Sequence, residues 1–545
     1  MLSYRKLAMR VLGRPLHTGG IDSPRPASQR AAAFILTAAM LTTLAAPAFA
    51  DIWHIEDGDI TVKAGETGND VTQKGTTTYG DTDTIITNSD KNTASSHTVT
   101  IEANDKDDKV EVTLKDVNID TSSRNKAAVS VTGSGNTTIK LDGDNALKSD
   151  SSRSGIYGSG SLTITGGEND SLTAKGGSGA DGSGGDGIHS GSLTIYGGTV
   201  NANGGNCGDG NYSDGGSGIY SDSGDVTISG GSTVTAKGGD GGSFGGGSGI
   251  SSFNRVAISG STVTATGGDS SSNSGGYGIS SLDVAISSGT VTANGGDSKD
   301  GSGGNGIYSS SGVTISGGTV NANGGSGKNG NGGNGIIGSG RVAISGGTVE
   351  AAGGNGSTGG GSGIYSSVID LSGSLELTAK AGSPNGKALS QNGKELNLDT
   401  IKDKLGPGAK VTATDANGET KQVSVPRPVE PEESSSSSDD GSAAPSAPVS
   451  SLPGLTVTDK DGQRISYTST QSGNTLTVCV GRLTASLRIS LAALRQMRAE
   501  GIETITFQTI LCSTTLSVDE LLAMGGEDAE AVLTHRLTDS SLTVG

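Results

Sequence analysis

The residues best suited to recognise a ligand are ring side chains that recur at one place in a repeated sequence. Each directly follows the dipeptide Gly-Ile: Tyr157, His189, Tyr220, Tyr308 and Tyr365. If successive repeats stack in register, these rings form two partial tracks on one face, where rings can pack on sugars and phenol oxygens can bond to hydroxyls. Tyrosine is also a good exposed strand residue, so the pattern alone does not require a ligand.

Carboxylates between these repeats form a second set that could bind a cation. The glycine-rich segments carry Asp181, Asp186, Asp209, Asp214 and Asp240 among small residues with accessible carbonyl oxygens. Hard oxygen ligands on tight loops suit calcium, so these aspartates are the candidate metal ligands. The alternative is a solvated acidic surface, which also agrees with the formal net charge of −18.

No arrangement for acid–base or nucleophilic catalysis is visible in the sequence. His189 has no evident partner, and the basic residues Arg255 and Arg341 occupy equivalent positions three repeats apart. A polysaccharide lyase needs clustered carboxylates and a proton acceptor in one groove. The sequence therefore predicts a protein that is not an enzyme.

A repeat of nearly constant length positions these residues. The dipeptide Gly-Ile recurs with spacings of 28 to 32 residues, and its glycines are Gly155, Gly187, Gly218, Gly249, Gly278, Gly306, Gly335 and Gly363. Each unit continues with two alternating segments, such as 313–316 and 319–322, separated by a glycine turn and followed by a glycine-rich segment. Alternation of apolar and polar residues marks strands with one buried face, and the fixed period marks a solenoid.

Stacking of these units gives the fold. The inward residues of one unit, Ile219, Val226 and Ile228, have counterparts in the other units. One coil buries almost nothing, but coils about 4.8 Å apart form continuous ladders of side chains and bond to the coils above and below. We expect an all-β parallel β-helix of about eight regular coils, with irregular coils at residues 109–147 and a cap at residues 369–423.

Composition divides the chain into four parts. Residues 1–50 are basic and then apolar, which predicts an export signal that is either cleaved before Asp51 or retained as an anchor. The β-helix with its caps then occupies residues 51–425. Residues 426–453 are rich in Pro, Ser and Glu and predict a linker, while strand and helix patterns in residues 454–545 predict a small α+β domain.

Charge and hydropathy restrict the partners and the location. The acidic balance argues against nucleic acid, whose phosphates need basic residues. After the predicted signal, no stretch approaches the roughly 20 apolar residues of a membrane span, so the mature chain is expected outside the bilayer. We expect a secreted, extracellular protein, with attachment to a cell surface left open. Cys479 and Cys512 either pair or stay reduced.

The sequence resembles a family of secreted bacterial carbohydrate-binding proteins. The resemblance rests on residues 112–119 (Val-Thr-Leu-Lys-Asp-Val-Asn-Ile), 145–147 (Asn-Ala-Leu), 155–157 (Gly-Ile-Tyr) and repeated units like residues 162–167, and it covers roughly residues 85–380. It implies a right-handed parallel β-helix similar to pectate lyases, without catalysis, that binds calcium and acidic plant cell-wall polysaccharides. This chain departs from the family in its longer glycine-rich segments and in having fewer aspartates in the later coils.

The sequence thus leads to two functional hypotheses. The first is an extracellular protein that binds a plant cell-wall or other polysaccharide, including acidic ones, with or without calcium. The second is a structural or adhesive stalk that presents the C-terminal domain. Which glycan binds, and the oligomeric state, stay open at this stage.

Overall fold

The computed structural model describes residues 51–179, 182–207, 213–426, 454–459, 462–465, 467–472, 474–480, 482, 484–509, 513–524, 529–536 and 539–544. The predicted signal, the predicted linker after Pro426, and the residues Asp181, Asp209 and Cys512 lie outside these ranges. Within the described residues, one hydrogen-bonded network of strands and one small sheet domain are present.

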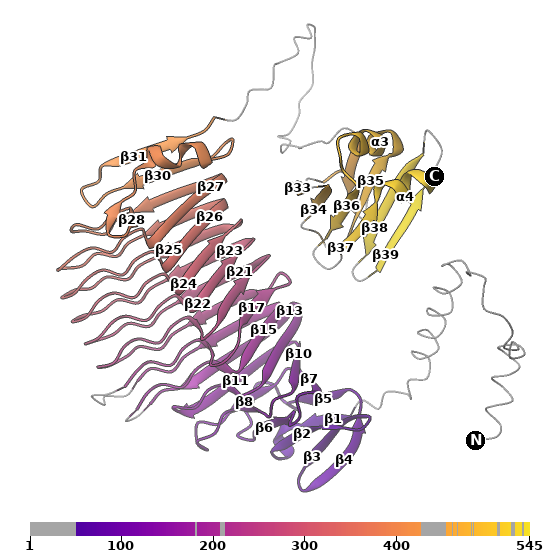
Figure 1. Cartoon of the computed structure of the whole chain (residues 1–545). Coiled ribbons are helices and arrows are strands. Elements are labelled where there is room, and N and C mark those ends of the chain that lie inside the picture. Colours follow the sequence, from indigo (N-terminus) through magenta and orange to yellow (C-terminus); the bar gives the residue numbers. More distant parts are fainter. Residues whose placement is uncertain are drawn as a thin grey trace, which may run out of the picture. The chain divides into compact units, whose positions relative to one another are not determined.

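The repeat region is a parallel β-solenoid of about 14 turns, which confirms the predicted fold class (Figure 1). The number of turns exceeds the eight regular coils that the Gly-Ile dipeptide marks. Coils before Gly155 carry valine at the same inward place, so Val99 and Val129 continue the column of Ile156 without the dipeptide. The dipeptide therefore undercounts the turns at the N-terminal end.

Three faces surround the core, and each consists of strands that pair with the next coil. The face that carries the ring side chains, called the track face here, is made of β2 (Ile60–Gly65), β6 (Val99–Glu102), β9 (Val129–Thr132), β12 (Ile156–Gly158), β14 (Ile188–Ser190), β16 (Ile219–Ser221), β19 (Ile250–Ser252), β22 (Ile279–Ile286), β24 (Ile307–Ile315), β26 (Ile336–Ala352), β27 (Ile364–Lys380) and β28 (Leu389–Gln391). Its strand pairs are parallel and follow the repeat period.

The second face starts at the other end of the same coils, and its strands are β1 (Ile52–His54), β5 (Thr84–Thr87), β7 (Lys109–Lys115), β10 (Asn136–Asp142), β13 (Ser161–Gly177), β15 (Ser192–Asn203), β17 (Val226–Ser229) and β20 (Arg255–Ile258), continued by β22, β24, β26 and β27. The third face contains β8 (Asn118–Asp120), β11 (Asp144–Ser151), β18 (Thr233–Lys237), β21 (Ser261–Thr266), β23 (Gly289–Asn294), β25 (Thr319–Asn323) and β30 (Lys410–Thr414), with parts of β13, β15, β26 and β27. Long strands such as β13 thus bend between two faces.

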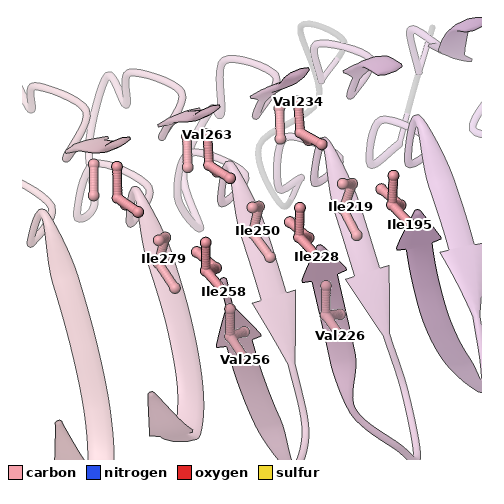
Figure 2. Close-up of a cluster of buried hydrophobic side chains, with 14 of the residues drawn as sticks. Ile195, Ile219, Val226, Ile228, Val234, Ile250, Val256, Ile258, Val263 and Ile279 are labelled. Atoms are coloured by element: carbon pink, nitrogen blue, oxygen red, sulfur yellow. The ribbon is translucent and has the colours of Figure 1, made fainter. Parts of the chain in front are cut away.

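The core between these faces consists of the predicted ladders. Ile195, Ile228 and Ile258 are paired in register from coil to coil, and each is at most 2% exposed (Figure 2). The same holds for Ile219 and Ile250 on the track face. Because apolar side chains alternate with outward polar ones, every strand buries one side only, and the core is one cluster along the whole solenoid.

Both ends of the solenoid are closed by antiparallel elements. At the N-terminal end, β3 (Gly68–Gln73) and β4 (Thr76–Asp81) form a hairpin meander with β2, preceded by the short 3-10 helix η1 (Ile55–Asp57). At the C-terminal end, β29 (Lys394–Glu395), the 3-10 helix η2 (Leu398–Lys404) and β31 (Thr420–Ser424) close the stack. The cap begins later than predicted, because residues 369–380 still belong to β27 and pair in register with β26.

The glycine-rich segments are ordered and form a second layer, seen as a stack of narrow extensions beside the sheets (Figure 1). We call residues 176–187, 204–218, 238–249, 267–278, 295–306, 324–335 and 353–363 the glycine arms, of which all but residues 180, 181 and 208–212 are described. Paired glycines link the arms by backbone hydrogen bonds: Gly247 donates to Gly239 of its own arm at 2.9 Å, and Gly268 of the next arm donates to Gly247 at 2.8 Å. The arms are therefore continuous hydrogen-bonded structure and not loose loops.

The paired glycines are needed for close packing and not for unusual dihedral angles. A Cβ on Gly268 would lie 1.9 Å from the carbonyl oxygen of Gly239, and Gly247 and Gly276 are equally tight. None of the three has a left-handed φ. In contrast, Gly230 and Gly231 turn between strands with φ of 73° and 76°, as the sequence predicts for this turn.

The C-terminal domain has its own core and two four-stranded sheets. One sheet contains β32 (Leu455–Thr458), β35 (Thr484–Ser490), β38 (Glu530–Arg536) and β39 (Asp539–Val544), and the other contains β33 (Thr468–Ser472), β34 (Thr475–Cys479), β36 (Thr504–Gln508) and β37 (Ser513–Ser517). The helices are α3 (Leu491–Ala499), which Ser490 caps through the N–H of Ala493, and α4 (Val518–Met524). This agrees with the predicted α+β class.

Candidate functional site

The predicted ring residues lie in register on the outer surface of the track face. Tyr157 pairs with His189, and His189 pairs with Tyr220, in three consecutive coils. The ring centroids of Tyr157 and His189 are 4.9 Å apart, and those of His189 and Tyr220 are 5.0 Å apart. The rings thus follow the spacing of the coils along the solenoid axis.

These rings pack on one another, which limits the ring faces that a ligand can reach. The planes of Tyr157 and His189 are tilted by 35°, and His189 meets Tyr220 edge to face at 68°. His189 therefore has a neighbour on each side. Tyr157 is the end ring of the series, because its partner in the preceding coil is Ser130, and it is 47% exposed. One face of Tyr157 is left for a ligand.

The second group of rings contains a member that the sequence analysis missed. Tyr308 pairs in register with Ser280 before it and Ile337 after it, and Ile337 pairs with Tyr365. The ring of Tyr277 lies 5.0 Å from that of Tyr308 with an interplanar angle of only 11°. Tyr277 immediately precedes a Gly-Ile dipeptide and so lies outside the repeat position that the sequence analysis followed.

A cleft of about 470 Å³ opens beside Tyr157. It forms because the two coils before Tyr157 carry small residues, Thr100 and Ser130, at the same outward register. Tyr157 and His189 line one side of this space. Thr100 and Ser130, which carry hydroxyl groups, line it in the two coils before Tyr157. The cleft thus offers hydroxyl groups and one aromatic ring side by side.

Two cations and an amide lie at the same cleft. Lys126, Arg153 and Asn125 all line it, and Arg153 Nε donates to Asn125 Oδ1 at 3.0 Å. Asp59 comes within 3.8 Å of Lys126 Nζ, but Asp59 already receives two hydrogen bonds from Arg124, at 2.6 and 2.9 Å. The carboxylate of Asp186 also lines the cleft, where it lies 2.9 Å from His189 Nδ1 and accepts the N–H of Ser217 at 2.7 Å. Because Asp59 is bonded to Arg124, and Asp186 to His189 and Ser217, the charges of Lys126 and Arg153 are available to an anionic ligand.

His189 has two carboxylate partners, which corrects the prediction that it has none. Its Nδ1 lies 2.9 Å from Asp186 Oδ2, and its Nε2 lies 3.4 Å from Asp222 Oδ2. Burial lowers the pKa of His189, but the hydrogen bond and charge of Asp186, followed by those of Asp222, outweigh burial and raise the pKa above the ordinary value. Both ring nitrogens are engaged by carboxylate oxygens, which fix the orientation of the imidazole ring.

The variant Asp186→Asn is expected to lower the pKa of His189, because it removes the strongest of the attractive interactions. In the wild type the folded pKa exceeds the unfolded value of 6.5. His189 therefore stabilises the fold fully below pH 6.5 and loses this contribution as pH rises through its folded pKa. NMR titration of the histidine rings, with His189→Gln for assignment and Asp269→Asn as control, measures this. An unchanged pKa in Asp186→Asn would contradict the assigned pairing.

The predicted calcium ligands that the structure describes do not converge on one point. Asp186 accepts from the backbone N–H of Ser217 at 2.7 Å, and Asp240 accepts from that of Asp269 at 3.1 Å. Asp214 lies on another glycine arm, and burial raises the pKa of its carboxyl group. Among the described residues, no three His, Cys, Asp or Glu side chains come together as metal ligands. These aspartates do not fit a calcium ion by themselves.

Instead, Asp240, Asp269 and Asp297 of the glycine arms form a column that joins successive coils. A side-chain oxygen of each accepts the backbone N–H of the equivalent residue in the next coil. Asp240 bonds to Asp269, Asp269 bonds to Asp297 at 2.8 Å, and Asp297 bonds to Ser326 at 2.6 Å. Asn206 precedes the column in the same way and bonds to Asp240 at 3.0 Å. This structural role suits aspartate and asparagine alike, since both have a side-chain oxygen that can accept the bond.

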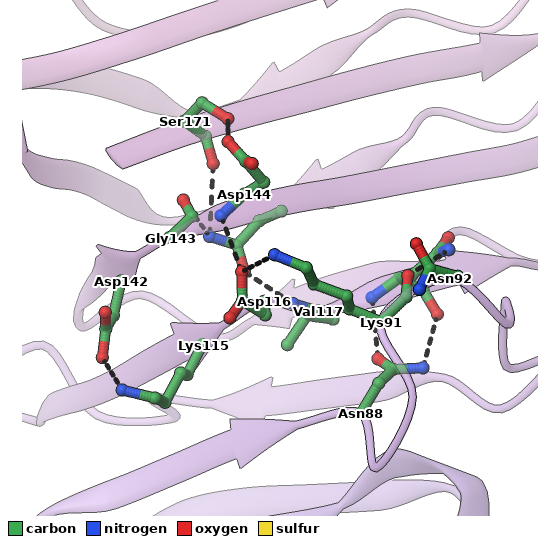
Figure 3. Close-up of polar contacts among 12 residues, drawn as sticks. Asn88, Lys91, Asn92, Lys115, Asp116, Val117, Asp142, Gly143, Asp144 and Ser171 are labelled. Atoms are coloured by element: carbon green, nitrogen blue, oxygen red, sulfur yellow. Dashed lines mark hydrogen bonds and ion pairs between the residues drawn. The ribbon is translucent and has the colours of Figure 1, made fainter. Parts of the chain in front are cut away.

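Another group of carboxylates lies at the turns between the second and third faces, where sequence analysis had not placed a site (Figure 3). Asp116 Oδ1 accepts the N–H of Asp144 at 3.1 Å and lies 3.4 Å from Lys91 Nζ, while Lys115 pairs with Asp142 at 2.5 Å. The N–H of Asp144 lowers the pKa of Asp116, burial opposes it, and Lys91 lowers it further. The positive charges of Lys91 and Lys115 therefore offset the negative charges of Asp116 and Asp142 within the protein.

The C-terminal domain contains the cysteine Cys479. Cys479 Sγ lies 3.6 Å from Gln508 Oε1, and its predicted alternative partner Cys512 is outside the described ranges. No helix in the described part of the chain is long and apolar enough to span a membrane.

The fold and this surface define a class of protein: a parallel β-solenoid with an aromatic track that ends in a polar cleft. Comparison of the chain with protein-family models, with curated proteins and with solved structures gives no match.

Proposed function

We propose that the protein binds a polysaccharide outside the cell, without catalysis, and that the chain lies along the track face. The observation that carries the proposal is the cleft at Tyr157, where an accessible ring, the hydroxyl groups of threonines and serines, and the cations Lys126 and Arg153 line one space. Sugars are bound by this combination of a ring face and a few directed polar groups. The resemblance to secreted carbohydrate-binding β-helices supports the same function.

The charges at the cleft favour an acidic polysaccharide. The whole chain is acidic, with a formal net charge of −18, and would repel a polyuronate. Lys126 and Arg153 provide a local exception, since both line the cleft and can pair with sugar carboxylates. Calcium that bridges protein and sugar carboxylates is the alternative way to overcome the repulsion, and it stays a proposal that the experiment below includes.

The absence of catalysis is also proposed from the geometry of His189. A general base must have a nitrogen free to accept a proton from the substrate. Both ring nitrogens of His189 lie at carboxylate oxygens, of Asp186 and Asp222. The arrangement supports a role in positioning the rings and not in proton transfer.

The test is retention of the purified chain on polygalacturonate, xylan, cellulose and mucin, each with calcium and with chelator. We expect retention on an acidic polymer, and Tyr157→Ala should weaken it about tenfold, since a ring contact of ~1–1.5 kcal/mol is lost. Tyr79→Ala is the matched control, because Tyr79 is 77% exposed on β4 and does not line the cleft. Loss of retention in chelator would assign a role to calcium.

Retention on none of the four polymers would contradict the proposal. The second hypothesis, a stalk that presents the C-terminal domain, would then be favoured. A stalk is indifferent to Tyr157→Ala, whereas removal of residues 454–545 would abolish its activity.

A further inference from the structure

A second exposed apolar cluster lies on the track face, several coils beyond the cleft. Phe253 is 74% exposed and Leu282 is 46% exposed. Phe253 directly follows β19 and Leu282 belongs to β22, so in adjacent coils both lie where the track face turns toward the second face. Two large apolar side chains held in water on a rigid sheet are typical of a binding surface.

The rings of Tyr277 and Tyr308 belong to the same cluster. Ser251 and Ser280, each two residues before one of the apolar residues, pair in register and occupy the outward positions that precede Tyr308. Alternate residues of a strand face the same side, so Ser280 and Leu282 of β22 share the outer surface with Tyr308, on which the ring of Tyr277 stacks. We call Phe253, Tyr277, Leu282 and Tyr308 the second subsite.

The second subsite repeats the plan of the cleft. At the cleft, the small residues Thr100 and Ser130 precede Tyr157 in register. At the second subsite, the small residues Ser251 and Ser280 precede Tyr308. The two places also lie on one column of the track face, because Tyr157, His189, Tyr220, Ser251, Ser280 and Tyr308 are paired from each coil to the next.

We infer that the second subsite binds another segment of the same polysaccharide chain, which runs along the solenoid axis; this inference rests on the proposed function. Tyr308 lies five coils from Tyr157, which is roughly 24 Å at the spacing of parallel strands. The ligand is therefore a polymer longer than this span. Its carboxylates pair at the cleft, and its sugar rings pack on the uncharged second subsite.

Two linked subsites make affinity depend on chain length. Once one segment is bound, the other segment is held near its subsite at high effective concentration, so a spanning chain binds more tightly than a short one. A trisaccharide is shorter than the span and occupies each subsite independently.

The test uses calorimetry with the full chain, with trigalacturonate and polygalacturonate as one pair of probes and xylotriose and xylan as the other. We expect two trisaccharides per wild-type chain and one per chain in the variant Phe253→Ser/Tyr308→Ala. The same variant should weaken polymer binding at least tenfold. Tyr157→Ala should also reduce the stoichiometry to one, and Tyr79→Ala should change nothing. Circular dichroism verifies that the exposed substitutions leave the fold intact.

Three results would overturn the inference, and one of them also overturns the proposed function. A single trisaccharide per wild-type chain, with unaltered polymer binding in the Phe253→Ser/Tyr308→Ala variant, would mean that only the cleft binds. A change of self-association in this variant, seen by analytical ultracentrifugation without a change in polymer binding, would identify the cluster as a protein contact. If no probe binds the wild type, the proposed function itself is wrong.

Discussion

The variant Gly268→Ala is expected to destabilise the solenoid by about 3 kcal/mol or more, at the upper end of overpacking effects. The new methyl group would lie 1.9 Å from the carbonyl oxygen of Gly239 and 2.4 Å from its carbonyl carbon. Both are backbone atoms of the preceding arm, which cannot rotate away as a side chain can. Gly268 also donates to Gly247 at 2.8 Å, so any movement of the arm weakens a hydrogen bond.

Urea unfolding followed by circular dichroism measures this effect, with Gly182→Ala as the control. A Cβ on Gly182 would meet only Ser152 Oγ, at 3.7 Å, and Gly182 has no left-handed φ. We expect the control to unfold within ~0.5 kcal/mol of the wild type, since Gly-to-Ala changes without strain are neutral or stabilising. Equal stability of Gly268→Ala and Gly182→Ala would show that the arms do not pack as described.

The variant Ile228→Asp is expected to unfold the coils around it, and Ile228→Ala to destabilise the solenoid by about 2–5 kcal/mol. Ile228 is fully buried, and Ile195 and Ile258 lie against it from the adjacent coils (Figure 2). A carboxylate at this place would have no partner in an apolar ladder. The two adjacent coils are destabilised as well, because each coil of a solenoid is stabilised only by the coils beside it.

Thr227→Asp is the matched control for Ile228→Asp. Thr227 is adjacent in sequence, belongs to the same strand β17, and faces outward between Thr194 and Ala257. We expect it to change the urea midpoint only slightly. Proteolysis of the two variants gives a second measurement, since only Ile228→Asp should expose new cleavage sites in the middle of the solenoid. Similar behaviour of the two variants would contradict the assigned inward and outward faces.

The period of the repeat allowed the inner ladders and the outer register to be predicted before the structure. A residue two places from an inward isoleucine or valine is inward as well, and a fixed repeat places equivalent residues side by side. For this reason the pairing of Tyr157, His189 and Tyr220 follows from the sequence. The sequence also predicts irregular coils at residues 109–147, but the full number of turns does not follow from the dipeptide, because Val129 replaces the Gly-Ile signature while it keeps the inward place of the isoleucine.

The regular structure of the glycine arms could not be predicted, because it depends on glycine having no side chain. Gly, Ser, Asn and Asp in a row resemble an irregular loop, and no period of alternating polarity marks them. Their order comes from backbone hydrogen bonds between arms, such as Gly268 to Gly247, that require the closest approach of two chains. The sequence analysis therefore assigned their aspartates to calcium, whereas Asp240 and Asp269 bond to backbone amides of the next coil.

The partners of His189 and Tyr308 were missed for a different reason. Asp222 is 33 residues from His189 and reaches it from the next coil, two residues beyond Tyr220, the register partner of His189. Tyr277 likewise reaches Tyr308 from a place outside that position. A repeat period predicts which residues occupy equivalent places in successive coils. Contacts between residues at different places of the repeat depend on the length and direction of each side chain.

The glycine pairs also restrict how the number of repeats in such a chain can change during evolution. Each glycine arm carries one pair on its outgoing half and one on its returning half, and together the two pairs bond the arm to the coils before and after it. A duplicated or deleted segment keeps all these bonds only if it is one complete unit of 28 to 32 residues. Unequal recombination of the gene by whole repeats would thus yield a shorter or longer solenoid that folds at once, whereas partial insertions would be selected against. The reach of the protein along a polymer is open to evolution in steps of one coil.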